Sequence, residues 1–293
     1  MATTAPSNQQ GPGGTNIAVS AVFQPTANLS SNAPDVALVS YNRVFFYVHY
    51  NALITASNNG FASLLSNVDL STVSTQQPVL VPVVEQSPVL NVILHTIYNM
   101  SAAAFNPSIP TLEAAVHGLA KYGTDVKTYI AWNRPLCNLL FARAPTAALA
   151  VYTIAAQYGL EDLAVATSPF LLSVKVTDVP IEHAERMGAI YLKRLLALQG
   201  DRLERLRAIL REPPPRHFDT PDCDADQQDD IARAWGLTAA YLIWEQRPEI
   251  THVTISVTFS SLFPGIRCQQ CLDNLQAWVA RAANAWARER RHI

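Results

Sequence analysis

The sequence predicts an α+β fold in which a small mixed sheet, capped by helices, is followed by an α-helical extension. Two observations predict this class. Runs rich in β-branched and aromatic residues, typical of strands, lie near the N-terminus at 36–39, 43–50 and 79–84. From residue 87 onward apolar side chains recur with a helical period, and proline or glycine marks where successive helices begin and end.

The three strand-like runs predict a hairpin and an edge strand. Tyr41 and Asn42 lie between the first two runs as a tight turn, so these runs are expected to pair with each other. The third run contains Pro82, which has no backbone N–H to donate to a neighbouring strand. An edge position is therefore expected for that strand.

The first helices are predicted from their caps and breaks. Residues 51–56 are expected to form a short helix, and residues 61–65 the next helical turns after a polar break. Thr111 is expected to cap a helix that ends at Tyr122 and Gly123, because glycine suits the left-handed position after a helix.

The C-terminal part is predicted to be mainly helical. A long amphipathic stretch covers 181–211, and Gly200 is its expected break. Residues 251–259 alternate like a strand, but no partner strand is evident nearby, so both strand and helix stay open there.

Composition divides the chain into five predicted segments. These are a disordered N-terminal segment at 1–33, a sheet-containing domain at 34–130, a helical extension at 131–211, an acidic, proline-rich linker at 212–230 and a mainly helical segment at 231–293. Within the first segment, the run at 16–23 is apolar enough for a short strand or a docking segment.

The charge content points to association with another protein. Charged residues make up 15% of the 293 residues, below the roughly 25% of an average soluble protein, and the N-terminal half is especially apolar. The net charge of −2 gives no basic excess for nucleic acid. No apolar run is long enough for a membrane span, and no secretory signal is evident. An intracellular protein, in cytoplasm or nucleus, with reduced cysteines is therefore expected.

Several segments, in this order, resemble the BTB/POZ family. Residues 46–53 (FYVHYNAL) resemble its Phe-x-Val-His-Arg-x-Val-Leu passage from strand into helix, after an opening Asp35-Val36. Residues 57–65 resemble its Ser-x-x-Phe-x-x-Met-Leu turn, with one extra residue before Phe61. The resemblance covers about 34–130.

Two later segments extend this resemblance. Residues 79–98 resemble the family's third strand and the helix that ends in Leu-x-x-Ile-Tyr, and residues 112–122 resemble the helix that ends in Ala-x-Lys-Tyr. The pattern at 145–161 is similar to that of BTB proteins numerous in mushroom-forming fungi.

The resemblance implies a non-enzymatic interaction module that forms a homodimer and binds a further, unidentified protein. The family commonly packs its first helix and N-terminal segment against a partner copy, which would place the segment at 16–23 in the dimer interface with five helix residues: Asn51, Ala52, Leu53, Thr55 and Ala56. The resemblance implies structural roles for Asp35 and His49.

One alternative is a substrate adaptor for a cullin-type ubiquitin ligase. Two departures from the family pattern weaken it: Tyr50 replaces a basic residue, and 99–110 lack the hydrophobic-x-acidic triplet that resembles the cullin-binding motif. A small-molecule enzyme built on the C-terminal segment is a third possibility. No G-x-S-x-G, P-loop or G-x-G-x-x-G motif occurs, so no catalytic or cofactor-binding residue is assigned.

The cysteines leave one question open. Cys268 and Cys271 have the C-x-x-C spacing that lets two sulfurs reach one metal, and Cys223 with His217 could complete a tetrahedral set. No second C-x-x-C pair is present, and no βαβ setting for a redox pair is evident. Simple packing at a helix start is the favoured interpretation, and no metal site is assigned.

Overall fold

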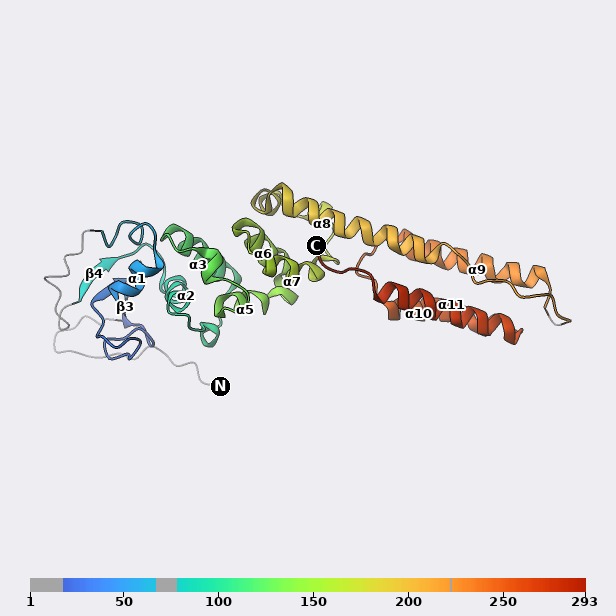
Figure 1. Ribbon diagram of the computed structural model, residues 1–293, viewed down its shortest axis with the longest axis horizontal. Coiled ribbons are helices and arrows are strands. Elements are labelled where there is room, and N and C mark those ends of the chain that lie inside the picture. The colour runs from blue at the N-terminus through green and yellow to red at the C-terminus, as the bar shows by residue number, and fades with distance from the viewer. Residues whose placement is uncertain (1–17, 67–77, 222) are drawn as a thin grey trace. The chain divides into compact units, whose positions relative to one another are not determined.

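The computed structural model describes residues 18–66, 78–221 and 223–293 and is mixed α/β, with a small four-stranded sheet and many helices (Figure 1). The chain divides into two compact units, Met1–Ala164 and Val165–Ile293. Residues 131–164, the first part of the predicted helical extension, lie in the same unit as the sheet.

The sheet of the N-terminal unit contains both parallel and antiparallel neighbours. Its strands are β1 (Ala18–Val19), β2 (Val36–Val39), β3 (Val44–Val48) and β4 (Val79–Pro82). They follow the order β1-β3-β2-β4, with β2 antiparallel to β3 and the outer pairs parallel. The predicted hairpin is confirmed, and β4 lies at an edge, as expected from its proline.

The segment before the hairpin corrects one prediction. Disorder was expected for 1–33, of which 1–17 lie outside the described residues, yet Ala18 and Val19 pair with β3. Phe23 is fully buried and its ring contacts those of Phe46 and Tyr98. Burying one phenylalanine offsets part of the entropy lost in ordering this segment, and the strand lies within the apolar run at 16–23.

Helices make up much of the rest of the N-terminal unit, and one of them is largely buried. They are α1 (Tyr50–Ala56), α2 (Ser87–Ile97), α3 (Ile109–Lys121), α4 (Val126–Tyr129), α5 (Pro135–Phe141) and α6 (Ala144–Tyr158), while α7 (Glu161–Thr167) spans the division between the units. Every residue of α2 from Leu90 to Ile97 is buried, and α2 packs against α1, α3 and α5.

The cap of α3 differs from the predicted one. The helix begins two residues before Thr111, and the side chain of Ser108 accepts a hydrogen bond from the Thr111 backbone N–H. Pro110 at the second helical position lacks the N–H that a helix start leaves unpaired, which favours the earlier beginning. The predicted end is confirmed, since Gly123 adopts a φ of +75° directly after Tyr122.

Residues 61–65 do not form the predicted right-handed helical turns. Phe61, Ala62 and Ser63 have φ angles of +56°, +55° and +63°. Their backbone N–H groups are captured locally, because Ser57 Oγ accepts from Phe61 at 2.7 Å and Asn59 Oδ1 accepts from Ala62 at 2.8 Å. Short polar side chains thus supply acceptors that compete with a helix.

The end of α3 is held by a small polar network at Glu85. The side chain of Glu85 is 10% exposed and accepts hydrogen bonds from the Tyr122 hydroxyl and from Lys121 Nζ, the latter at 2.7 Å. Burial by itself raises the pKa of Glu85, but these hydrogen bonds outweigh it and hold the pKa below its ordinary value of 4.5.

This network predicts a pH dependence of stability. Because the folded pKa of Glu85 is lowered, its stabilisation is present above pH 4.5 and is lost as the pH falls through the folded pKa. We expect Glu85→Gln to unfold more easily at pH 7, by about 1 kcal/mol, and to lose less stability than the wild type below pH 4.5. Urea unfolding at a series of pH values measures both, and equal pH profiles would contradict the assignment.

The C-terminal unit is a bundle of helices in which α8 (Ile181–Leu210), α9 (Ala225–Trp244), α10 (His252–Ser260) and α11 (Gln269–Ala287) lie side by side (Figure 1). Short 3₁₀ turns occur along the chain at Ala103–Phe105, Ser168–Leu171, Val176–Asp178 and Phe263–Gly265. Among the helices of the described ranges, none is both long and apolar enough to cross a membrane.

One core holds this bundle together. Its largest members are Trp235 of α9 and Trp286 of α11, and Trp235 stacks on Phe259 of α10 with ring centroids 4.1 Å apart. The buried apolar residues of the core are Leu206, Leu210, Trp235, Ala239, Leu242, Ile250, Ile255, Phe259, Leu275, Val279, Ala282 and Trp286. All four helices therefore contribute to one hydrophobic cluster.

The structure decides between strand and helix at 252–260 and moves the predicted break in α8. Residues 252–260 are helical, because Thr251 caps α10 and the buried Ile255 and Phe259 are four residues apart on one face. The break in α8 occurs at Gly188 (φ +71°, ψ +165°) and not at Gly200, which stays helical. Glycine adopts helical as well as non-helical backbone angles, so the sequence does not show which of the two glycines interrupts the helix.

Candidate functional site

The predicted dimer residues divide between two faces of α1. Leu53 is fully buried and Ala56 is 5% exposed, so both belong to the core of their own chain. Asn51 and Thr55 are exposed and Ala52 is half-buried. The helical period places these three on the outer side of α1, so they are the predicted residues that a partner could contact.

Asp35 and His49 hold the junction between β3 and α1. The Asp35 carboxylate accepts a hydrogen bond from the Tyr50 backbone N–H at 2.6 Å, at the first residue of the helix. Both ring nitrogens of His49 have partners, with Nδ1 2.8 Å from the Tyr98 hydroxyl and Nε2 2.9 Å from the Asn32 carbonyl oxygen. Both side chains are used in fixing the backbone.

In the C-terminal unit, four metal-ligating side chains converge: His217, Cys223, Cys268 and Cys271. Their ligand atoms all lie within 4.8 Å of one another. Nε2 of His217 is 3.0 Å from the sulfur of Cys271 and 3.4 Å from that of Cys268, and the sulfurs of Cys223 and Cys271 are 3.5 Å apart. The sequence pattern named these four, and the fold brings all of them together.

Local structure positions each of these groups. Cys268 is the N-cap of α11 and Cys271 lies in its first turn, so the C-x-x-C spacing directs both sulfurs toward one point. The backbone of Cys223 exchanges two hydrogen bonds with Thr220 just before α9. His217 lies on the segment between α8 and α9, which has little regular structure.

The electrostatics distinguish the three thiols. The backbone N–H of Cys271 donates to the sulfur of Cys268 and lowers the pKa of Cys268 to about 7, although burial opposes the shift. Burial raises the pKa of Cys271 to about 12 and also raises the pKa of Cys223. Without an ion, Cys268 is therefore the thiol that ionises first near neutral pH.

Two partners that the sequence did not reveal orient His217. Its Nδ1 lies 2.7 Å from the Phe218 carbonyl oxygen, and its backbone N–H donates to the side chain of Gln228 at 2.9 Å. Gln228 belongs to α9 and is only 5% exposed. A glutamine in an acidic stretch carries no recognisable signal for this role.

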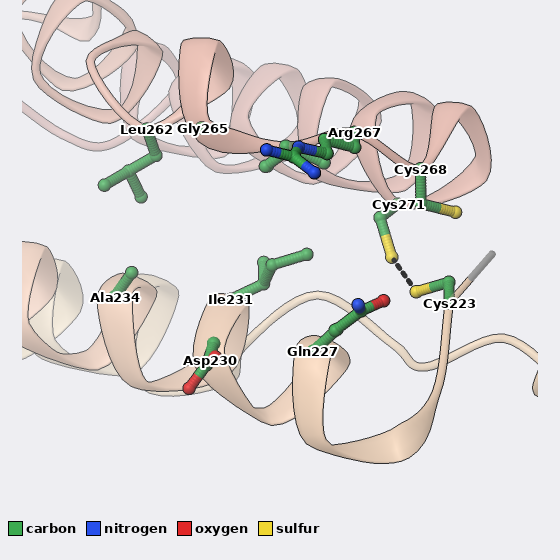
Figure 2. Close-up of a pocket in the computed structure, with 11 residues that line it drawn as sticks. Cys223, Gln227, Asp230, Ile231, Ala234, Leu262, Gly265, Arg267, Cys268 and Cys271 are labelled. Atoms are coloured by element: carbon green, nitrogen blue, oxygen red, sulfur yellow. Dashed lines mark hydrogen bonds between the residues drawn. The ribbon is translucent and has the colours of Figure 1, made fainter.

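A cavity of about 740 Å³ lies beside the cysteines. Figure 2 shows Cys223 and Cys271 directed toward each other at one end, with Ile231 and Ala234 of α9 facing Leu262 and Gly265 across the space. Asp230 and Arg267 are the charged residues of its lining. Chemically, the arrangement can ligate a metal ion or undergo thiol–disulfide exchange.

No protein-family model matches this sequence, and comparisons with curated proteins and with solved structures give no match either.

Proposed function

We propose that this chain is a protein-interaction module without enzymatic activity that associates with a second copy of itself through the outer face of α1. The proposal keeps the function that the resemblance to BTB/POZ domains implies. The observation that carries it is the scarcity of charge around this helix. No Asp, Glu, Lys or Arg occurs between Arg43 and Asp69, a stretch that includes all of α1.

The whole N-terminal unit shares this property. The chain has 21 basic and 23 acidic residues, 44 in all, and only 12 of these lie in residues 1–164. The buried centres of protein interfaces are depleted in charged residues, because each unpaired charge would lose its hydration there. A surface with few charges is therefore suited to burial against a partner.

A second copy is the partner best suited to this face. In a two-fold symmetric contact the same patch meets itself, and a charged residue close to the axis would face its own copy and be repelled. Asn51 and Thr55 are uncharged, and the small Ala52 allows two backbones to approach closely. A stable dimer commonly buries more than about 2,000 Å², so surfaces next to α1 would contribute as well.

The test is the mass of the full-length protein in solution, by light scattering and sedimentation over a range of concentrations. The wild type is expected at twice the chain mass of 32.1 kDa. The double variant Asn51→Glu, Thr55→Glu places four like charges across the two-fold axis and is expected to shift the protein to monomer. Both positions are exposed, so the fold should be retained, which circular dichroism checks.

A matched control introduces the same charges elsewhere on the unit. Leu80 and Val84 are 60% and 71% exposed, and they lie in β4 and just after it. The variant Leu80→Glu, Val84→Glu is expected to remain a dimer. A monomeric wild type at every concentration, or dissociation of the control in place of the α1 variant, would refute the proposal.

A further inference from the structure

Three thiols and one imidazole meet in the C-terminal unit from two segments about 50 residues apart in the sequence: the connection between α8 and α9, and the start of α11. We propose that His217, Cys223, Cys268 and Cys271 bind one zinc ion as a closed, structural site. This inference concerns the C-terminal unit and is independent of the proposed dimerisation.

The chemistry of the four groups selects the metal. Thiolate and imidazole are soft or borderline ligands that suit Zn²⁺, whereas Ca²⁺ and Mg²⁺ require oxygen ligands. The group of four contains no carboxylate. Three cysteines and one histidine form one of the common ligand sets of tetrahedral structural zinc sites.

The distances also fit a tetrahedral ion. With Zn–S near 2.3 Å and Zn–N near 2.0–2.1 Å, tetrahedral geometry places two sulfurs about 3.8 Å apart and a sulfur about 3.6 Å from a nitrogen. The Cys223–Cys271 sulfur pair is 3.5 Å apart, and His217 Nε2 lies 3.0 and 3.4 Å from the sulfurs of Cys271 and Cys268. Separations larger by about 0.2–0.6 Å at these three pairs would match the tetrahedral values, and no two of the four ligand atoms are more than 4.8 Å apart.

The histidine already has the orientation that a ligand needs. The Phe218 carbonyl accepts a hydrogen bond from Nδ1 of His217, so in the neutral ring the lone pair is on Nε2, which faces the sulfurs. Metal-ligating histidines almost always donate their other ring N–H in this way. Gln228 holds the backbone of the same residue and adds a second constraint on the ring position.

Two other uses of the thiols explain the arrangement less well. A disulfide would need sulfurs about 2.0 Å apart, and all three cysteines have free thiols. A redox pair formed by Cys268 and Cys271 would not require Cys223 and His217, yet both are directed at the same point. Metal ligation uses all four groups at once.

The number of ligands indicates the role of the ion. Four protein ligands leave no open position for water or substrate, which is typical of structural rather than catalytic zinc. The site would join the segment that contains His217 and Cys223 to the first turn of α11. Zinc would therefore fasten the long connection between α8 and α9 to the bundle.

The experiment uses the full-length chain, purified in reducing buffer, with metal content measured by mass spectrometry and affinity measured against a chromogenic chelator. One zinc per chain is expected, and Co²⁺ in its place should give the absorption bands of tetrahedral thiolate coordination. Removing a residue that only hydrogen-bonds a metal ligand commonly weakens zinc binding about 10–100-fold. Cys271→Ser removes a ligand itself, so it should weaken zinc binding at least about 100-fold. Cys137→Ser, which removes the cysteine outside the group, should bind zinc like the wild type.

A second measurement needs no variant and covers the case in which Cys271→Ser misfolds. Alkylation of the folded wild type, mapped by peptide mass, should be slowed by zinc at Cys223, Cys268 and Cys271. Three results would overturn the site: a wild type that takes up neither Zn²⁺ nor Co²⁺, zinc that leaves the alkylation of these thiols unchanged, or a disulfide among them in zinc-replete, reduced protein.

Discussion

Replacing Trp235 with alanine is expected to lower the free energy of unfolding of the C-terminal unit by about 3–5 kcal/mol. The side chain is 1% exposed and stacks on Phe259, so its removal leaves a large cavity where α9 meets α10. The indole N–H also donates to the Leu210 carbonyl at 2.9 Å. Leu210 ends α8, so this bond satisfies a carbonyl that the helix itself leaves unpaired.

Trp235→Phe separates the two contributions. Phenylalanine keeps an aromatic ring in the core but cannot donate to Leu210, so a smaller loss of about 1–3 kcal/mol is expected. The chain has five tryptophans, so fluorescence would mix signals from different sites. Hydrogen exchange of peptides from α8 to α11, followed in increasing urea, reports the C-terminal unit alone. A loss below about 1 kcal/mol for Trp235→Ala would contradict its central place in the core.

Arg202 is the second position at which a large effect is expected. Its guanidinium is buried, with the residue 4% exposed, and donates to the backbone carbonyls of Pro248 at 2.8 Å and Arg290 at 2.7 Å. It also lies 4.2 Å from the ring centre of Trp286. One side chain of α8 thus binds the segments that follow α9 and α11.

We expect Arg202→Ala to destabilise the C-terminal unit by about 3 kcal/mol, because the buried Pro248 carbonyl and the partly buried Arg290 carbonyl lose a charged donor and the tryptophan face loses its cation. Burial, followed by the nearby charge of Arg291, lowers the pKa of Arg202 to about 10, so the group is still protonated at neutral pH. The same hydrogen-exchange measurement quantifies the loss.

Arg202→Lys is the matched control, because lysine keeps the positive charge but lacks the planar guanidinium with its several N–H donors. A lysine ammonium cannot reproduce the separate directions of the Nε and Nη1 donors, so intermediate stability is expected. Equal stability of the alanine variant and the wild type would show that the carbonyl contacts contribute nothing net.

Local sequence patterns predicted the regular elements correctly where no distant contact and no competing side chain overrides the backbone preference of a residue. The turn at Tyr41 and Asn42, the edge position of β4 and the end of α3 at Gly123 all follow from backbone preferences of single residues. Predictions failed where a non-local contact or a competing side chain decided. Burial of Phe23 orders part of the segment 1–33, which was expected to be mostly disordered, and Ser57 and Asn59 divert the backbone that was expected to be helical.

The sequence by itself determined the mixed fold class, the scarcity of charge around α1 and the four residue types that could hold a metal. Tertiary structure decided that Ile255 and Phe259 of the helix at 252–260 are buried, that Leu53 and Ala56 face their own core, and that His217 and Cys223 reach Cys268 and Cys271. The physical reason is the distance along the chain over which each kind of interaction acts. Backbone preferences and side-chain periods act over a few residues, whereas convergence of groups about 50 residues apart depends on how α8, α9 and α11 pack.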